Sequence, residues 1–166
     1  MTKKIYKIFL FSTIGFVLIS SCVFGAGFQS FSSESNRASK ALNCGNSKVT
    51  PASHGWGALY GCIQGNAQTV KWFINEKPNT GQVENIKFMW NDWFKDFGDG
   101  LHADKIEAQN ALKVLIKLYA PQKGKEIEQI FWGNINKTIE SDDFILKYTY
   151  SRGPAIDERM IVITPK

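Results

Sequence analysis

Two helices are predicted between residues 104 and 133 by apolar side chains that recur every three or four positions. The first helix covers 105–119, where one apolar stripe consists of Ala108, Ala111, Leu112, Leu115 and Tyr119. Asp104 precedes it as the expected capping residue, with Glu107 as its capping-box partner, and Pro121 follows its end. A second helix is expected over about 124–132, with an inward side formed by Ile127, Ile130 and Phe131.

Strands are predicted where apolar and polar residues alternate, since successive side chains of a strand point to opposite faces. Such alternation occurs twice as a pair of segments joined by turn residues, which is typical of a β-hairpin. The first hairpin covers about 69–90, with Pro78 and Gly81 in its turn. The second covers about 143–164, with Gly153 and Pro154 in its turn, and a shorter strand is expected at 58–63.

The order hairpin, two helices, hairpin predicts an α+β fold. Two hairpins without a parallel crossover favour an antiparallel sheet. Because the apolar stripes of both helices need a partner, we expect the helices at 105–119 and 124–132 to pack on one face of that sheet.

The first 25 residues have the pattern of a bacterial signal peptide. Lys3, Lys4 and Lys7 precede a mainly apolar run at 8–19, and small residues follow. We therefore predict that 1–25 direct export to the periplasm, or to a membrane-anchored position facing the periplasm or cell surface. The segment 26–47 is rich in Ser and Asn and is predicted to be a flexible tether, and 48–166 to form a single α+β domain.

Three fates of this leader are open. Ile19-Ser20-Ser21-Cys22 resembles the bacterial lipobox, in which an aliphatic residue and two small residues precede a cysteine. The resemblance implies that Cys22 carries acyl chains that anchor the protein to a membrane. Ordinary signal-peptidase cleavage before Ala26 is the second fate, and an uncleaved leader that spans the bilayer is the third.

Cys44 and Cys62 are the two cysteines that lie beyond the leader. In an oxidising compartment such a pair usually forms a disulfide, and we predict one here. A loop of this size contributes about 3 kcal/mol on the chain-entropy model. The spacing of the pair is not that of a zinc site, and a catalytic thiol is the other alternative.

The net charge of +5 overstates the basic character of the chain. Three of the 20 basic residues lie in the leader, which leaves 17 against 15 acidic residues, with no block of one sign. Nothing in this balance indicates nucleic-acid binding. We find no phosphate-binding glycine loop, paired-histidine metal motif or nucleophile elbow in the sequence, and we predict no cofactor.

The segment 90–104 is the best candidate for chemistry. It contains Trp90, Asp92, Trp93, Asp96, Asp99 and His102. Its oxygen ligands could hold calcium, but their spacing does not fit an EF-hand, and turn formation and capping explain the Asp and Gly residues better. The segment also contains the aromatic residues Phe94 and Phe97. If its four aromatic side chains were exposed together with Trp72, they would form a contact surface for a glycan, peptide or partner protein.

These observations predict an exported envelope protein that binds another envelope protein or a cell-wall component and is not an enzyme. The alternative is a small envelope hydrolase. It would use the acidic segment 92–104, or a thiol with His54 or His102 as its base.

Overall fold

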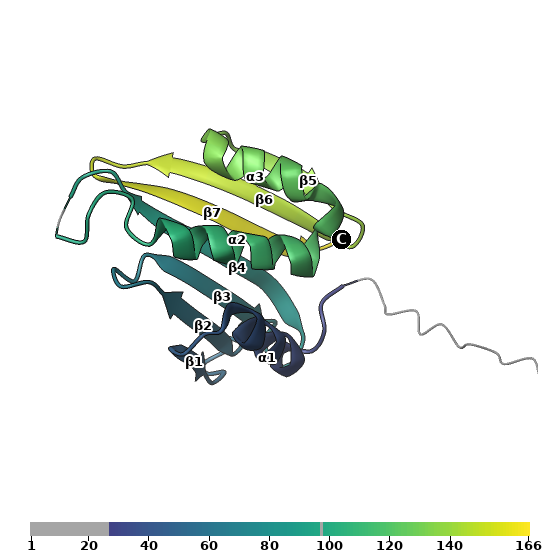
Figure 1. Cartoon of the computed structure of the whole chain (residues 1–166). Helices are drawn as coiled ribbons and strands as arrows, with labels where there is room; N and C mark the ends of the chain where they lie inside the picture. Colours follow the sequence, from purple (N-terminus) through teal and green to yellow (C-terminus); the bar gives the residue numbers. More distant parts are fainter. Residues whose placement is uncertain (1–26, 97) are drawn as a thin grey trace, which may run out of the picture.

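The computed structural model describes residues 27–96 and 98–166, which form an antiparallel sheet with helices on one of its faces (Figure 1). The elements in chain order are α1 (Phe31–Leu42), β1 (Ser47–Thr50), β2 (Leu59–Gln64), β3 (Val70–Glu76), β4 (Val83–Trp93), α2 (Lys105–Tyr119), the 3-10 turn η1 (Pro121–Lys123), α3 (Gly124–Gly133), β5 (Lys137–Glu140), β6 (Phe144–Arg152) and β7 (Ile156–Pro165). The predicted leader, including Cys22 and the cleavage site at Ala26, lies outside the described residues. None of the described helices is long and apolar enough to span a membrane.

The predicted α+β fold is confirmed. The two hairpins are β3–β4 and β6–β7, and they join into one sheet because β4 pairs with β7, with Phe88 opposite Ile161. The strand order is β1-β2-β3-β4-β7-β6-β5. The sequence reasoning missed β1 and β5, because these four-residue edge strands bury no side chain and one side chain respectively, which leaves no alternation to detect.

The hydrophobic core lies between the helices and one face of the sheet. All five residues of the predicted stripe on α2 are buried, as are Ile127 and Phe131 of α3, whereas Ile130 is partly buried. The inward-facing residues of β3 and β4 form the sheet side of the core. Across this core, Phe88 of β4 stacks on Phe131 of α3 with ring centroids 5.4 Å apart. The sequence pattern therefore identified the inner face correctly.

Residues 31–42 form helix α1 and are not part of the flexible tether predicted for 26–47. Ser30 caps the helix by accepting a hydrogen bond from the backbone N–H of Ser33, and Asn43 ends it in the left-handed conformation at φ 48°. The helix was missed because its buried side is half polar, consisting of Glu34, Ser35, Ala38 and Leu42. Such a face has little apolar periodicity.

A buried carboxylate holds the start of α1 against α2. Glu34 is fully buried, and its Oε1 accepts hydrogen bonds from the Tyr119 hydroxyl at 2.6 Å and from Arg37 Nε at 2.9 Å. The guanidinium of Arg37 also lies over the Tyr119 ring. Burial and the neighbouring Glu34 carboxylate raise the pKa of Tyr119, which keeps its hydroxyl protonated as a donor.

The predicted disulfide between Cys44 and Cys62 is confirmed and holds the other end of α1. Cys44 follows the helix, and Cys62 is fully buried in β2, with the two Cα atoms 6.2 Å apart. Nearby, Gln64 Nε2 donates a hydrogen bond of 2.8 Å to the carbonyl of Leu42, the last residue of α1. Helix α1 is therefore fixed to the domain at both ends.

The capping box predicted at Asp104 is wrong. Asp104 precedes α2 with a φ of 58°, and its side chain makes no capping hydrogen bond. Its carboxylate instead accepts hydrogen bonds from the backbone N–H and the hydroxyl of Thr69, at 3.0 and 2.9 Å, and from Ala67. A Cβ atom on Gly65 would lie 2.0 Å from this carboxyl carbon, so the β2–β3 turn requires glycine there. The Asp104 carboxylate thus binds the distant Thr69 in place of the first turn of α2.

Candidate functional site

The predicted candidate residues are divided between strand β4 and the loop that follows it. Because β4 extends to Trp93, its alternation places Trp90 and Asp92 on the face that the helices cover. Trp90 is 1% exposed and donates a hydrogen bond of 3.0 Å from its indole to the carbonyl of Ala103. The condition for an aromatic contact surface, exposure of these side chains, is therefore not met by Trp90 or by Trp72, which is equally buried. Trp93 lies half-buried on the other face, and Phe97 lies outside the described residues.

Asp92 and His102 form the centre of the candidate site. Asp92 is buried, and its Oδ1 lies 2.6 Å from His102 Nδ1, while the His102 side chain is 49% exposed. The hydrogen bond from the backbone N–H of His102 to the Trp93 carbonyl and a φ of 54° fix this residue in a left-handed conformation. An imidazole oriented by a buried carboxylate can bind a polar group or move a proton.

Arg159 of β7 is the second partner of Asp92, and the sequence reasoning missed it. Its Nε and Nη2 each lie 3.3 Å from Asp92 Oδ2, and its Nη1 donates to the carbonyl of Phe131 at 2.8 Å. The guanidinium also donates to Asn134 Oδ1, and it lies over the rings of Trp90, Trp132 and Tyr150. The alternation of β7 contained the signal, since Arg159 has the same parity as Ile161 and Ile163 and so points inward.

Asp157 and Tyr150 extend this polar cluster toward the β6–β7 turn. The Tyr150 hydroxyl donates a hydrogen bond of 2.5 Å to Asp157 Oδ2, and this contact raises the pKa of Tyr150. Asp157 Oδ1 is buried and has no hydrogen-bond partner among the described residues. The cluster therefore combines two buried carboxylates that lie opposite each other on β4 and β7, at Asp92 and Asp157.

The other two acidic candidates are exposed in the loop after β4. Asp96 Oδ1 accepts hydrogen bonds from the backbone N–H groups of Gly98 and Gly100, at 2.8 and 3.0 Å, which is a turn-forming role. Asp99 is also exposed. In the described ranges no group of three or more His, Cys, Asp or Glu side chains is arranged to hold a metal ion.

Exposed apolar side chains occur in the segments that carry this cluster. Six large apolar side chains are exposed in the described part of the chain, and three of them lie within four residues of His102 or Asn134: Leu101, Ile106 and Ile135. A fourth, Ile156, precedes Asp157 on β7, so strand alternation places it on the face that the helices do not cover, opposite Trp93. We call Leu101, Ile106, Ile135 and His102 the end surface, because the β4–α2 loop, the start of α2 and the end of α3 lie toward the same end of the sheet (Figure 1).

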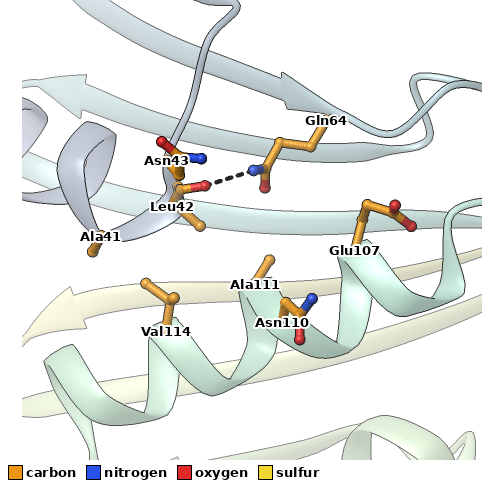
Figure 2. Close-up of a pocket in the computed structure, with 8 residues that line it drawn as sticks. All are labelled: Ala41, Leu42, Asn43, Gln64, Glu107, Asn110, Ala111 and Val114. Carbon is orange, nitrogen blue, oxygen red and sulfur yellow. Dashed lines mark hydrogen bonds between the residues drawn. The ribbon is translucent and has the colours of Figure 1, made fainter.

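A small pocket of about 260 Å³ opens between α1, β2 and α2, and Figure 2 shows its lining. Its rim carries the amides of Asn43 and Asn110 and the carboxylate of Glu107, while the amide of Gln64 is already bonded to Leu42. Small-molecule sites usually measure roughly 300–1,000 Å³. We therefore assign this pocket no ligand.

Comparisons with protein-family models, with curated proteins and with solved structures find no match for this chain. The function is accordingly inferred from the candidate site and from the leader sequence. The residues that define the site are Asp92, His102 and Arg159 with the three exposed apolar side chains of the end surface.

Proposed function

We propose that this chain is an exported bacterial envelope protein that binds another envelope protein through its end surface. The observation that carries the proposal is the presence of Leu101, Ile106 and Ile135, which are 62–68% exposed, in the segments that contain the half-exposed His102 and Asn134. Exposed apolar side chains scattered singly are normal, but a group of them around a polar centre is typical of an interaction site.

Two further features support a protein partner. In the loop that carries Leu101, the exposed Asp96 and Asp99 outnumber the exposed Lys95, so this loop has no excess of positive charge to attract an anionic membrane. The end surface also lies at the end of the sheet opposite Gly27, where the leader joins the domain (Figure 1). A leader anchored at Cys22 would leave this end of the domain free for a partner.

Hydrolysis is the second candidate function, and the hydrogen bond between Asp92 and His102 favours it, since this pair could act as a general base. The thiol version of this hypothesis is excluded, because both Cys44 and Cys62 are consumed by the disulfide. Among the described residues, no serine or threonine hydroxyl is hydrogen-bonded to His102. The described site therefore supports binding better than nucleophilic catalysis.

The proposed export is tested by mass spectrometry of the mature N-terminus. We expect acyl chains on Cys22, as the resemblance of residues 19–22 to a lipobox implies. A free N-terminus at Ala26 would instead support ordinary cleavage and a periplasmic protein. Recovery of the protein from the cytosol with Met1 retained and the disulfide reduced would contradict export.

The proposed contact surface is tested by photo-crosslinking in living cells. We expect a photoreactive residue at position 101, 106 or 135 to crosslink the same envelope protein, and a residue at Val49 to crosslink none. Val49 is a matched control because it is 52% exposed but lies on the edge strand β1. Ile106→Glu combined with Ile135→Glu should abolish the crosslink from position 101, because charged side chains are unfavourable in the apolar core of an interface.

Equal crosslinking from Val49, or no crosslink from the three positions, would contradict this surface. A His102→Asn variant separates the two functions. If the protein acts by binding alone, this variant should retain most of the crosslinking, because the three apolar side chains of the end surface are unchanged. If the protein is a hydrolase, the same variant should lose turnover while the crosslinks persist.

A further inference from the structure

The face of the sheet that the helices do not cover carries an unusual mixture of lysine and apolar side chains. Antiparallel sheets often expose one face to water, and that face is then mainly polar. Here the alternation of β3, β4 and β7 places Phe73, Met89, Met160 and Val162 on the uncovered face, each partly exposed. The uncovered face is therefore neither a core nor an ordinary solvated surface.

Strand register arranges these residues in two rows that cross the sheet. The six strand pairings give the first row, which has one residue from each of the seven strands and reads Lys48, Gly61, Phe73, Lys87, Val162, Lys147 and Thr138. The second row lies beside it and reads Ile63, Lys71, Met89, Met160 and Thr149. We call these two rows the lysine face.

The lysine face is positively charged and has unpaired cations. Lys48, Lys71, Lys87 and Lys147 belong to it, and none of the four forms an ion pair with a described residue. Neither row contains an acidic side chain, and Glu158 lies in the next row, opposite Asn91 and Ser151. Neighbouring strands are about 4.8 Å apart, so Lys48 and Lys87 are roughly 14 Å apart and Lys87 and Lys147 roughly 10 Å.

We propose that the lysine face rests on the surface of an anionic lipid membrane. The apolar side chains between the lysines can contact the boundary of the acyl chains, while the lysine stems reach outward so that each ammonium group meets a lipid phosphate. This charge complementarity is spread across six strands, which suits a broad surface with many anionic groups.

The choice of cation favours a lipid surface over an acidic protein. All four basic residues of the two rows are lysine, whereas protein interfaces are enriched in arginine and depleted in lysine. Arginine offers a rigid fork for bidentate pairing, but lysine is a flexible point charge that needs no defined geometry from its partner. The end surface contributes nothing to this inference, so each proposal can fail independently of the other.

The experiment uses the methionine methyl groups of the mature protein as reporters. Apart from Met1, the chain contains only Met89 and Met160, and both lie on the lysine face. Methyl-labelled protein is mixed with bicelles of phosphatidylcholine, with or without phosphatidylglycerol, that contain a spin-labelled lipid. Any acyl chains on Cys22 would insert into both kinds of bicelle, so the readout is contact of this face and not recruitment of the protein.

We expect both methyl signals to broaden only with phosphatidylglycerol and to recover in high salt. Each lysine near an anionic surface contributes about 1 kcal/mol, which is about fivefold. Lys71→Gln combined with Lys87→Gln should therefore shift the equilibrium toward the free face by about 30-fold. The matched control, Lys113→Gln with Lys117→Gln on exposed positions of α2, should change it little.

Equal broadening with phosphatidylcholine alone, no broadening in either lipid, or an equal loss in the α2 control would overturn the proposal. If polyglutamate perturbs the two signals and phosphatidylglycerol does not, the face binds an acidic polypeptide, which also overturns it. Unchanged circular dichroism spectra and urea midpoints of the variants without lipid show that they are folded, whereas the Met89 shift itself is expected to move because Lys71 is paired with Met89.

Discussion

Replacing Asp92 by alanine is expected to lower the free energy of unfolding by about 3–5 kcal/mol. The reason is that Arg159 is buried and loses the carboxylate that accepts hydrogen bonds from its Nε and Nη2. Removing one partner of a buried pair leaves an uncompensated charge, which costs more than the pair itself contributes. Urea denaturation of the purified variant, monitored by circular dichroism, measures the loss.

Asp99→Ala provides the control, because Asp99 is exposed in the loop that follows β4. We expect that substitution to change the unfolding free energy by no more than about 0.5 kcal/mol. Asp92→Asn keeps the volume of the side chain and one acceptor oxygen, so its effect should lie between those of the two alanine variants. A loss below 1 kcal/mol for Asp92→Ala would mean that Arg159 is satisfied without this carboxylate.

Removal of the disulfide is the second change with a large expected effect. The double variant Cys44→Ala with Cys62→Ala should lose about 3 kcal/mol, because the bond closes a loop of 18 residues and restricts the unfolded chain. Since Cys62 is fully buried, the missing sulfur adds a packing cost. The measurement is the urea midpoint with and without a reducing agent.

The reducing agent itself supplies the control for this prediction. Reduction should lower the midpoint of the wild-type protein and leave that of the double variant unchanged. Because the disulfide follows α1 directly, the reduced protein should also be cleaved sooner by protease within residues 31–46. Identical midpoints for the oxidised and reduced wild type would show that the bond does not stabilise the domain.

The candidate site illustrates how far local sequence patterns reach. The segment 90–104 was identified from its Asp and His residues, and Asp92 and His102 do form the centre of the site. The sequence did not reveal Arg159, which lies 67 positions from Asp92 and reaches it only because β4 and β7 are neighbours. Trp90 was a candidate binding residue only if exposed, and its place in the alternation of β4 buries it.

The helix at 31–42 shows that a segment without a local pattern can still be ordered by contacts with a distant part of the chain. Its composition is typical of a tether, yet Glu34 gains the Tyr119 hydroxyl, from a residue 85 positions away, as a hydrogen-bond donor. Burial of a carboxylate is unfavourable until such donors are in place. Since these donors come from a distant part of the chain, no pattern within residues 26–47 could have predicted the docked helix.

Local patterns were enough to predict the α2 stripe, the inner faces of both hairpins and the pairing of the two cysteines beyond the leader. The docking of α1, the role of Asp104 and the two rows of the lysine face depend instead on contacts between distant segments. The difference is one of range along the chain. Periodicity and turn chemistry act within a few residues, whereas strand order and buried hydrogen bonds join residues that are distant in the chain.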